Sequence, residues 1–198
     1  MPAIHTERAF EDALEAHLLG HGWRKGDPAA FDRTLALMQG DLFAFIEETQ
    51  GSTWEALRTQ HGAALEEGVL AALVRALDTQ GALDVLRHGF KFFGRRLEVA
   101  AFRPVSGLND ETQARSRANR LVIARQVRPD PASEISVDVV LFLNGLPIAT
   151  LELKNELTGQ SLAHAITQYK QRDPRLPLFA FKKRALVHFA VDTDLVAM

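Results

Sequence analysis

The stretch from Val137 to Asn155, VDVVLFLNGLPIATLELKN, decides the fold of this chain. Two apolar segments flank an Asn-Gly pair, which is the strongest short signal for a β-hairpin. A hairpin of this composition belongs inside a sheet, yet it carries Asp138, Glu152 and Lys154. Charges in an apolar sheet are costly unless a partner balances them. The three charged residues therefore need a common explanation.

The length of the turn determines whether the charges meet, because side chains alternate between the two faces of a strand. A two-residue turn at 144–145 would pair Asp138 with Leu151 and send the two carboxylates to opposite faces. A loop one residue longer would pair Asp138 with Glu152. It would also make Pro147 the first residue of the second strand, where its missing N–H costs least. We predict this three-residue loop or an equivalent bulge.

With that register, the two carboxylates and Lys154 converge on one face. Two neighbouring carboxylates repel each other unless positive charge lies between them. A hard divalent cation, which prefers oxygen ligands, would supply that charge. Lys154 would then hold or polarise a water at the metal. The alternative is a solvent-exposed face on which Glu152 and Lys154 form an incidental ion pair.

The composition is that of a globular protein. The chain has 198 residues, of which 46% are hydrophobic and 24% are charged, and its formal net charge is −2. It has no cysteine, which excludes disulfides and thiolate zinc sites. No apolar run is long enough to span a bilayer, and the N-terminus lacks the pattern of a secretory signal. We therefore expect a cytoplasmic protein with no membrane partner.

The pattern of apolar residues predicts a helical part followed by a sheet-rich part. Helices are expected over residues 6–20, 28–48, 52–60, 62–79, 111–119 and 161–171. Besides the quoted hairpin, strands are expected at 121–127 and 185–191, and a second hairpin at 90–93 and 97–102. The fold class is α/β, with a mixed central sheet flanked by helices. We expect a single domain, 1–198, composed of a mainly helical part, 1–82, and a sheet-rich part, 83–198.

The first predicted helix carries two acidic residues on its apolar side. On a helical wheel at about 100° per residue, Glu7 and Glu11 fall inside the arc formed by Phe10, Leu14 and Leu18. A helix built only to pack would turn its acidic residues to solvent. We predict that one of them points inward, and we favour Glu11 because it lies one turn deeper. The alternative is that both overhang the edge of the core and interact with the helix dipole.

Basic residues gather in two segments, 112–129 and 170–184. A stand-alone nucleic-acid binder would have a more basic overall charge than −2, so any phosphate-facing patch is local. The alternative is that both segments are solvated faces. From the first interpretation we predict DNA phosphate contacts for Arg120, Arg125, Arg172, Lys182 and Lys183.

An Asp on one strand and Glu-x-Lys on the next resemble the motif of the PD-(D/E)xK nucleases. The surrounding sequence is more specific. Arg125-Gln126-Val127, the stretch 136–155 and Leu157-Thr158-Gly159-Gln160 resemble the N-terminal nuclease domain of type I restriction endonuclease R subunits. The similarity includes residues 6–11 and 188–192, so it runs across most of the chain. It implies the restriction-endonuclease-like fold, a mixed sheet flanked by helices.

The resemblance implies a Mg²⁺ site, at which Mn²⁺ would substitute, that hydrolyses DNA phosphodiester bonds. The metal ligands would be Asp138, Glu152 and the main-chain carbonyl of Leu153. Lys154 would position the attacking water. Nucleases of this branch also bring a glutamate from an N-terminal helix to the metals. This supports Glu11, or Glu7, as a ligand of a second metal or of a water.

Related nucleases carry a Gln-x-x-x-Tyr motif on the helix after the Glu-x-Lys strand. Gln168 fits the first position, which implies an active-site or DNA-contacting role. The residue four positions along is Arg172, and Tyr169 directly follows Gln168. Arg172 would take over the tyrosine position as a phosphate contact, or Tyr169 would reach the site from another angle. The plain alternative is that Gln168 only caps neighbouring backbone.

In the family, an ATPase motor follows this domain. The phosphate-binding motif G-x-x-x-x-G-K-[ST] does not occur in these 198 residues. We therefore expect a fragment of a longer protein, with ATP bound only in motor domains outside it. The implied partners are double-stranded DNA and the specificity and methyltransferase subunits of a restriction-modification complex.

The expected function is that of a Mg²⁺-dependent endonuclease, the cleavage module of a type I restriction enzyme. The first alternative is a non-catalytic DNA-binding or assembly module that retains the nuclease fold. A further alternative, from a different class, is a structural protein–protein domain with a salt-bridged hairpin.

Overall fold

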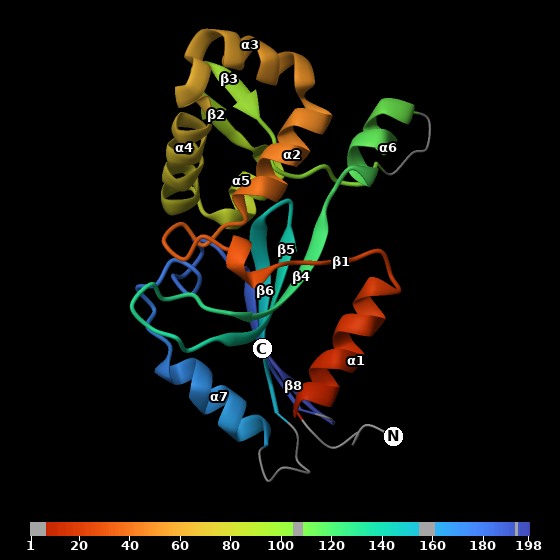
Figure 1. Cartoon of the computed structure of the whole chain (residues 1–198), viewed down its shortest axis with the longest axis vertical. Helices are drawn as coiled ribbons and strands as arrows, with labels where there is room; N and C mark the ends of the chain where they lie inside the picture. The colour runs from red at the N-terminus through yellow and green to blue at the C-terminus, as the bar shows by residue number, and fades with distance from the viewer. Residues whose placement is uncertain (1–6, 105–108, 155–160, 193) are drawn as a thin grey trace.

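The computed structural model describes residues 7–104, 109–154, 161–192 and 194–198 of the chain (Figure 1). Within these residues lies a six-stranded sheet of order β1-β4-β5-β6-β7-β8. Strands β4, β5 and β6 form an antiparallel meander, while β1 runs parallel to β4 and β7 runs parallel to β6. The predicted mixed sheet is therefore confirmed. Its strands are β1 Arg24–Lys25, β4 Leu121–Val127, β5 Val137–Leu143, β6 Leu146–Leu153, β7 Val187–Val191 and β8 Val196–Ala197.

Two helices lie on opposite sides of the sheet, α1 (Glu7–Leu19) and α7 (Leu162–Gln171) (Figure 1). The apolar residues of α1 pack against Ile123, Val139 and Leu153. Helix α7 contacts β6 and β7. Both helices agree with the sequence prediction. None of the helices in the described part of the chain is long and apolar enough to cross a membrane.

A lobe of helices and a small hairpin lies at one end of the sheet (Figure 1). Its buried side chains form one hydrophobic cluster with Leu146, at the start of β6. The lobe is thereby fastened to the turn of the β5–β6 hairpin. Its elements are α2 Gln39–Thr49, α3 Gly51–His61, α4 Leu65–Thr79, α5 Ala82–His88, β2 Phe90–Phe92 and β3 Arg95–Leu97. Helix α6, Asp110–Arg117, precedes β4, and two 3₁₀ turns are η1, Pro28–Ala30, and η2, Gly62–Ala64.

The prediction of one helix over 28–48 is wrong in its first half. After η1 the chain makes a tight turn, and α2 begins only at Gln39. The Asp32 carboxylate accepts the backbone N–H groups of Thr34 and Leu35, and Ala36 has a φ of 55°. Aspartate stabilises turns in this way, and that local bonding competes with helix formation.

Other differences concern short elements. Helix α5 and the two-residue strands β1 and β8 carry too little periodicity to be predicted from the sequence. The predicted second hairpin exists, but its second strand is Arg95–Leu97 instead of 97–102. Phe93 and Gly94 have φ values of 44° and 75°, which places the two-residue turn there.

The β5–β6 hairpin has a two-residue turn, contrary to the predicted three-residue loop. Asn144 and Gly145 have φ values of 50° and 79°, as a type I′ turn requires. The equivalent bulge then restores the predicted register, because the pairing with β5 skips Ile148. Continued by one residue, that register puts Asp138 opposite Glu152. The pairs are Leu143 with Leu146, Phe142 with Pro147, Leu141 with Ala149, Val140 with Thr150 and Val139 with Leu151.

Candidate active site

The three charged residues of the hairpin lie at its open end, away from the turn. Asp138, Glu152 and Lys154 are all buried, with 9%, 0% and 8% of their surfaces exposed. The backbone pairing of β5 with β6 ends at Val139 and Leu151. Beyond it, the Asp138 carboxylate takes the place of a backbone acceptor. Its Oδ2 accepts the Leu153 backbone N–H at 2.7 Å. The backbone therefore fixes one oxygen of Asp138 in the sheet.

Glu152 is the least satisfied group of the site. Its Oε1 forms an ion pair with Nη2 of Arg172, whereas its Oε2 has no hydrogen-bond partner among the described residues. Burial and the charge of Asp138 raise the pKa of Glu152 to about 7, although Arg172 and Lys154 oppose this shift. A buried carboxylate with a raised pKa and an unpaired oxygen is typical of functional sites.

Arg172 follows α7 and is largely buried beside Glu152. Its Nη2 also donates to the Ser136 carbonyl at 2.5 Å, and its guanidinium lies 5.7 Å from the ring centroid of Phe179. The sequence suggested a phosphate contact at this position. The structure instead places its positive charge on a carboxylate of the candidate site, so a DNA contact by Arg172 would first require it to leave Glu152.

Tyr169 reaches the same face of β6 by another route. Its hydroxyl is 2.8 Å from Oγ1 of Thr150, which is 2.7 Å from Nδ1 of His188. Burial raises the pKa of Tyr169 and lowers that of His188. The side chain of Gln168, on the same helix, is half-buried and makes no hydrogen bond to another described residue. The role predicted for Gln168 stays a prediction.

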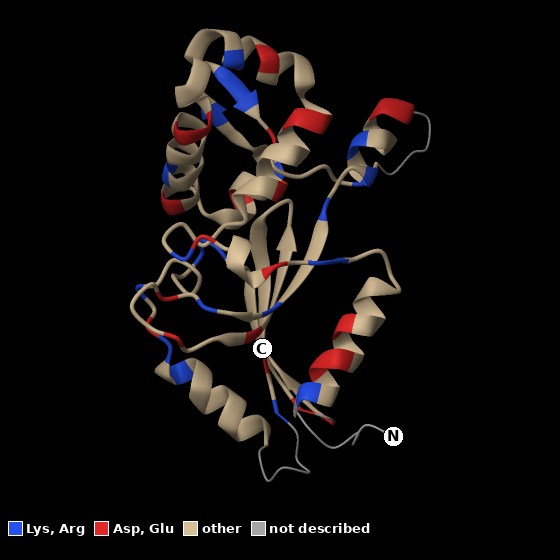
Figure 2. Ribbon diagram, in the orientation of Figure 1, with Lys and Arg blue, Asp and Glu red and all other residues tan. Residues whose placement is uncertain are grey.

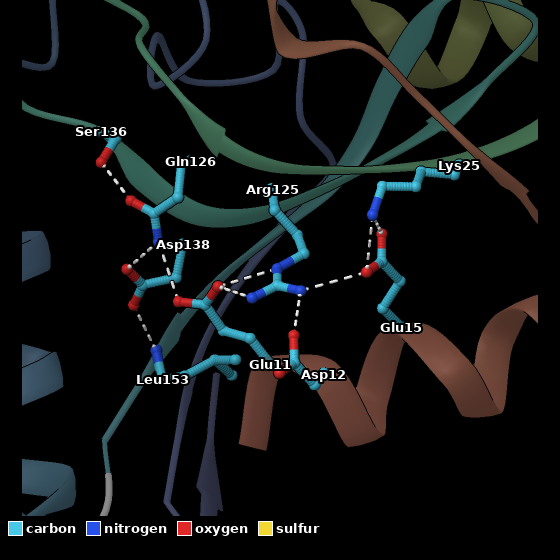
Figure 3. A network of polar contacts seen from close by, with 9 residues as sticks. All are labelled: Glu11, Asp12, Glu15, Lys25, Arg125, Gln126, Ser136, Asp138 and Leu153. Atoms are coloured by element: carbon cyan, nitrogen blue, oxygen red, sulfur yellow. Dashed lines mark hydrogen bonds and ion pairs between the residues drawn. The ribbon is translucent and has the colours of Figure 1, made fainter. Parts of the chain in front are cut away.

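Glu11 points inward, as the helical wheel predicted, and only 6% of it is exposed. Its Oε2 accepts from Nε of Arg125 at 2.8 Å, and its Oε1 accepts from Nε2 of Gln126 at 2.8 Å (Figure 3). The same Nε2 lies 3.4 Å from Oδ1 of Asp138. Glu11 therefore reaches Asp138 through Gln126. Glu7 begins α1, but its side chain lies outside the described residues.

Arg125 is surrounded by acidic residues of α1. Its guanidinium is 2.7 Å from Glu11, 2.5 Å from Asp12 and 3.1 Å from Glu15 (Figure 3). Hydrogen bonds to these carboxylates raise the pKa of Arg125 despite its partial burial. The residue thus fastens α1 to β4. Its charge is already balanced by acidic partners, and the predicted phosphate contact stays a prediction.

The remaining predicted DNA contacts lie at the other end of the hairpin. Arg120 pairs with Glu48 at 3.1 Å. Its backbone N–H donates to Oδ1 of Asn144, and its carbonyl accepts the Asn144 N–H. The Lys182 carbonyl accepts the backbone N–H of Ala82, the first residue of α5. Nζ of Lys183 lies 3.8 Å from Oδ1 of Asp78 in α4. Figure 2 shows that lysine and arginine are distributed over both parts of the molecule. The structure does not bring these three residues to the carboxylates, and their DNA contacts stay predictions.

The donor atoms of the site suit a hard cation with few protein ligands. Among the described residues, no group of three or more His, Cys, Asp or Glu side chains could hold a metal. Mg²⁺ is nevertheless commonly held by one or two carboxylates, with water and substrate oxygens completing its shell. Asp138 and Glu152, with the unpaired Oε2, offer that set. The Leu153 carbonyl remains a predicted ligand.

Sequence reasoning missed two residues of the site. Thr150 has a sequence signal, because alternation places it on the same face of β6 as Glu152. Gln126 has no such sequence signal, since regular alternation along β4 would point its side chain away from α1. Its position depends on a backbone conformation that only the structure shows.

A mixed sheet flanked by helices, with Asp138 and a Glu152-x-Lys154 motif on adjacent strands, defines a nuclease-like α/β protein. The sequence matches the family model of the type I restriction enzyme R protein N terminus over residues 6–198. The chain therefore belongs to this family, whose members work in a complex with DNA and other subunits. No curated protein matches the sequence.

Proposed function

We propose that this chain is the Mg²⁺-dependent endonuclease module of a type I restriction enzyme and hydrolyses DNA phosphodiester bonds. The observation that carries the proposal is the convergence of Asp138, Glu152 and Lys154 at the open end of one hairpin, where Oε2 of Glu152 has no hydrogen-bond partner among the described residues. A sheet that only had to pack would not keep two carboxylates together in its interior. The family membership supports the same function.

The cation would be held by Asp138, Glu152 and the Leu153 carbonyl, with Mn²⁺ able to substitute. Bound there, it would supply Lewis acidity toward a phosphoryl oxygen and a more acidic water. Glu11 would act through Gln126 or through a water, because its own oxygens contact Arg125 and Gln126. Its direct binding of a second metal would require those contacts to rearrange.

Lys154 is the group that would act on the reacting atoms. Lys154 is a buried residue whose positive charge acts on Glu152, in surroundings where charges interact more strongly than in water. It would position the attacking water and stabilise the negative charge that develops on the phosphate. Gln168, half-buried on α7, would steady the substrate.

The partners in this proposal are double-stranded DNA and the specificity and methyltransferase subunits. Sequence recognition and most of the DNA affinity would belong to those subunits, which agrees with the net charge of −2. ATP would bind only in motor domains of the parent protein.

The test is Mn²⁺ binding by calorimetry on the native chain and on Asp138→Asn and Glu152→Gln. Each variant removes one ligand charge with little change in shape, so both should lose most of the binding. The matched control is Glu48→Gln, because Glu48 is a carboxylate at the turn end of the sheet. Absence of Mn²⁺ binding by the native chain at millimolar concentration, even with a DNA duplex present, would refute the proposal.

Cleavage is tested in the assembled enzyme with ATP. We expect Lys154→Met to retain Mn²⁺ binding but to lower DNA cleavage by about 10²- to 10³-fold, the usual effect of removing one group that stabilises developing charge. The ATPase activity should survive, because the motor is a separate domain. Unchanged cleavage by this variant would remove Lys154 from the mechanism.

One observation favours the alternative of a non-catalytic DNA-binding or assembly module. Arg172 already provides a positive charge to Glu152. In that case Arg172 would be the permanent partner of the carboxylate, Mn²⁺ would not bind, and DNA would be bound without being cleaved. The calorimetry on the native chain separates the two functions.

A further inference from the structure

Gln126, the next-to-last residue of β4, has an unusual backbone conformation for a strand residue. Its φ is 53°, in the left-handed region that residues with a Cβ rarely adopt. The conformation breaks the alternation of β4. Ala124 and Val127, which would otherwise face opposite sides, pack in the same cluster, while Arg125 and Gln126 both reach Glu11. The strained backbone thus adds a second side chain to the α1 face.

The amide of Gln126 joins three elements of the site. Its Nε2 donates to Oε1 of Glu11 at 2.8 Å and lies 3.4 Å from Oδ1 of Asp138, and its Oε1 is 2.6 Å from Oγ of Ser136 (Figure 3). Ionised carboxylates only accept hydrogen bonds, so the NH₂ group must face them. The orientation of the amide is therefore determined by chemistry although its oxygen and nitrogen are alike in shape.

We propose that Gln126 is a positioning residue of the metal site, which ties Glu11 of α1 to Asp138 of β5 through one neutral amide. This inference rests on the proposed function. With Leu153 bound to Oδ2 and Gln126 at Oδ1, both oxygens of Asp138 are oriented before a cation arrives. Preorganised ligands bind a metal more tightly, and groups that orient a ligand contribute to this affinity.

Other residue types would serve this position less well. Lysine or arginine would satisfy both carboxylates and would also repel a divalent cation. Aspartate or glutamate would add a third negative charge. Glycine would adopt the backbone conformation without strain but would offer no donor. A neutral group with two N–H donors, such as the glutamine amide, can hold two carboxylates together. It leaves their negative charge available to attract a cation.

The experiment measures Mn²⁺ affinity by calorimetry and the urea midpoint of the 198-residue chain. In Gln126→Gly we expect Mn²⁺ to bind about 10- to 100-fold more weakly, as for other residues that orient metal ligands. The urea midpoint should stay equal or rise, because glycine relieves the backbone strain. In Gln126→Leu, which keeps the strain and loses the donors, we expect the same loss of affinity without a higher midpoint.

The matched control is Phe93→Gly. Phe93 also has a positive φ, 44°, but it lies at the exposed turn between β2 and β3, far along the chain from the carboxylates. This variant should bind Mn²⁺ like the native chain. It separates the effect of a glycine at a strained position from the effect of losing the amide.

Three outcomes would overturn the inference. If the native chain binds Mn²⁺ and both Gln126 variants bind it equally well, Gln126 does not position the site and the proposed function stands. If Gln126→Gly loses stability together with affinity, the residue is structural. If the native chain binds no Mn²⁺ with or without a duplex, the proposed function fails and the inference fails with it.

Discussion

Asn144 and Glu152 are buried polar residues at opposite ends of the β5–β6 hairpin, and they differ in how fully their hydrogen bonds are made. At the turn, Asn144 is completely buried, and its Nδ2 donates to the Val99 carbonyl and to Oδ1 of Asn119, both at 2.9 Å. Its Oδ1 accepts the Arg120 N–H at 2.6 Å. Both amide donors are thus used. At the open end, Glu152 has a raised pKa and one oxygen with no partner in the described part of the chain.

This contrast distinguishes a structural polar residue, Asn144, from a candidate functional one, Glu152. A buried polar group with all its partners in place stabilises one conformation. A buried group that lacks a partner lowers stability and persists where a ligand can complete it. The turn end therefore holds the helical lobe on the sheet, and the open end is the place for a cation and a substrate.

The largest effect is expected at the turn, from Gly145→Ala. A Cβ at Gly145 would lie 2.1 Å from the carbonyl oxygen of Met38, and the φ of 79° disfavours any side chain. Because the clash is with backbone, we expect a loss of about 4 kcal/mol or more in the free energy of unfolding. Urea denaturation measures it.

The control for this variant is Gly40→Ala in α2, where a Cβ would meet nothing within 4 Å. Alanine is the better helix former, so the control should be neutral or slightly more stable. If both variants have the same urea midpoint of unfolding as the native chain, the turn does not fasten the lobe to the sheet.

An intermediate effect is expected from pH at the open end. The pKa of Glu152 is about 7 in the folded chain against 4.5 for the unperturbed group, so the folded state binds more protons between these values. In the metal-free chain, the stability that protonated Glu152 contributes should therefore be fully present below the lower pKa. It should be lost as the pH rises through the upper pKa, by at most about 3 kcal/mol. Urea denaturation of the metal-free chain across this window measures the decline.

Glu152→Gln isolates the contribution of this carboxylate, because all other titrating groups are shared with the native chain. The variant should be more stable than the native chain above the upper pKa and should match it below the lower one. Parallel stability profiles for the two proteins would mean that Glu152 has an ordinary pKa.

The smallest effect is expected from the double variant Lys182→Gln/Lys183→Gln at the turn end. Mn²⁺ affinity should not change, because these residues contact α4 and α5 and not the carboxylates. The salt dependence of DNA binding should weaken by about one unit of slope for each lysine–phosphate interaction that the variant removes. An unchanged slope would show that the turn end does not contact DNA.

Much of the sheet could be predicted from the sequence because its signals are local. The strand at 121–127, both strands of the central hairpin and the helices α1 and α7 follow from the periodicity of apolar residues. The pairing of Asp138 with Glu152 followed from the position of Pro147, although a bulge at Ile148 and not a longer turn produces it. The predicted helix over 28–48 was wrong in its first half, because hydrogen bonds from the backbone to the Asp32 side chain override the helical pattern there.

Strand alternation and turn chemistry act over a few residues, so the sequence alone was enough to establish the mixed sheet, its central hairpin and the meeting of two carboxylates with a lysine. The surroundings of these three residues depend on long-range packing. Arg172 meets Glu152 from 20 residues away, and Arg125 meets Glu11 from 114 residues away. The left-handed conformation of Gln126 is likewise maintained by its neighbours in the fold, against its own preference. Contacts of this kind depend on how helices close over the sheet, which local sequence does not encode.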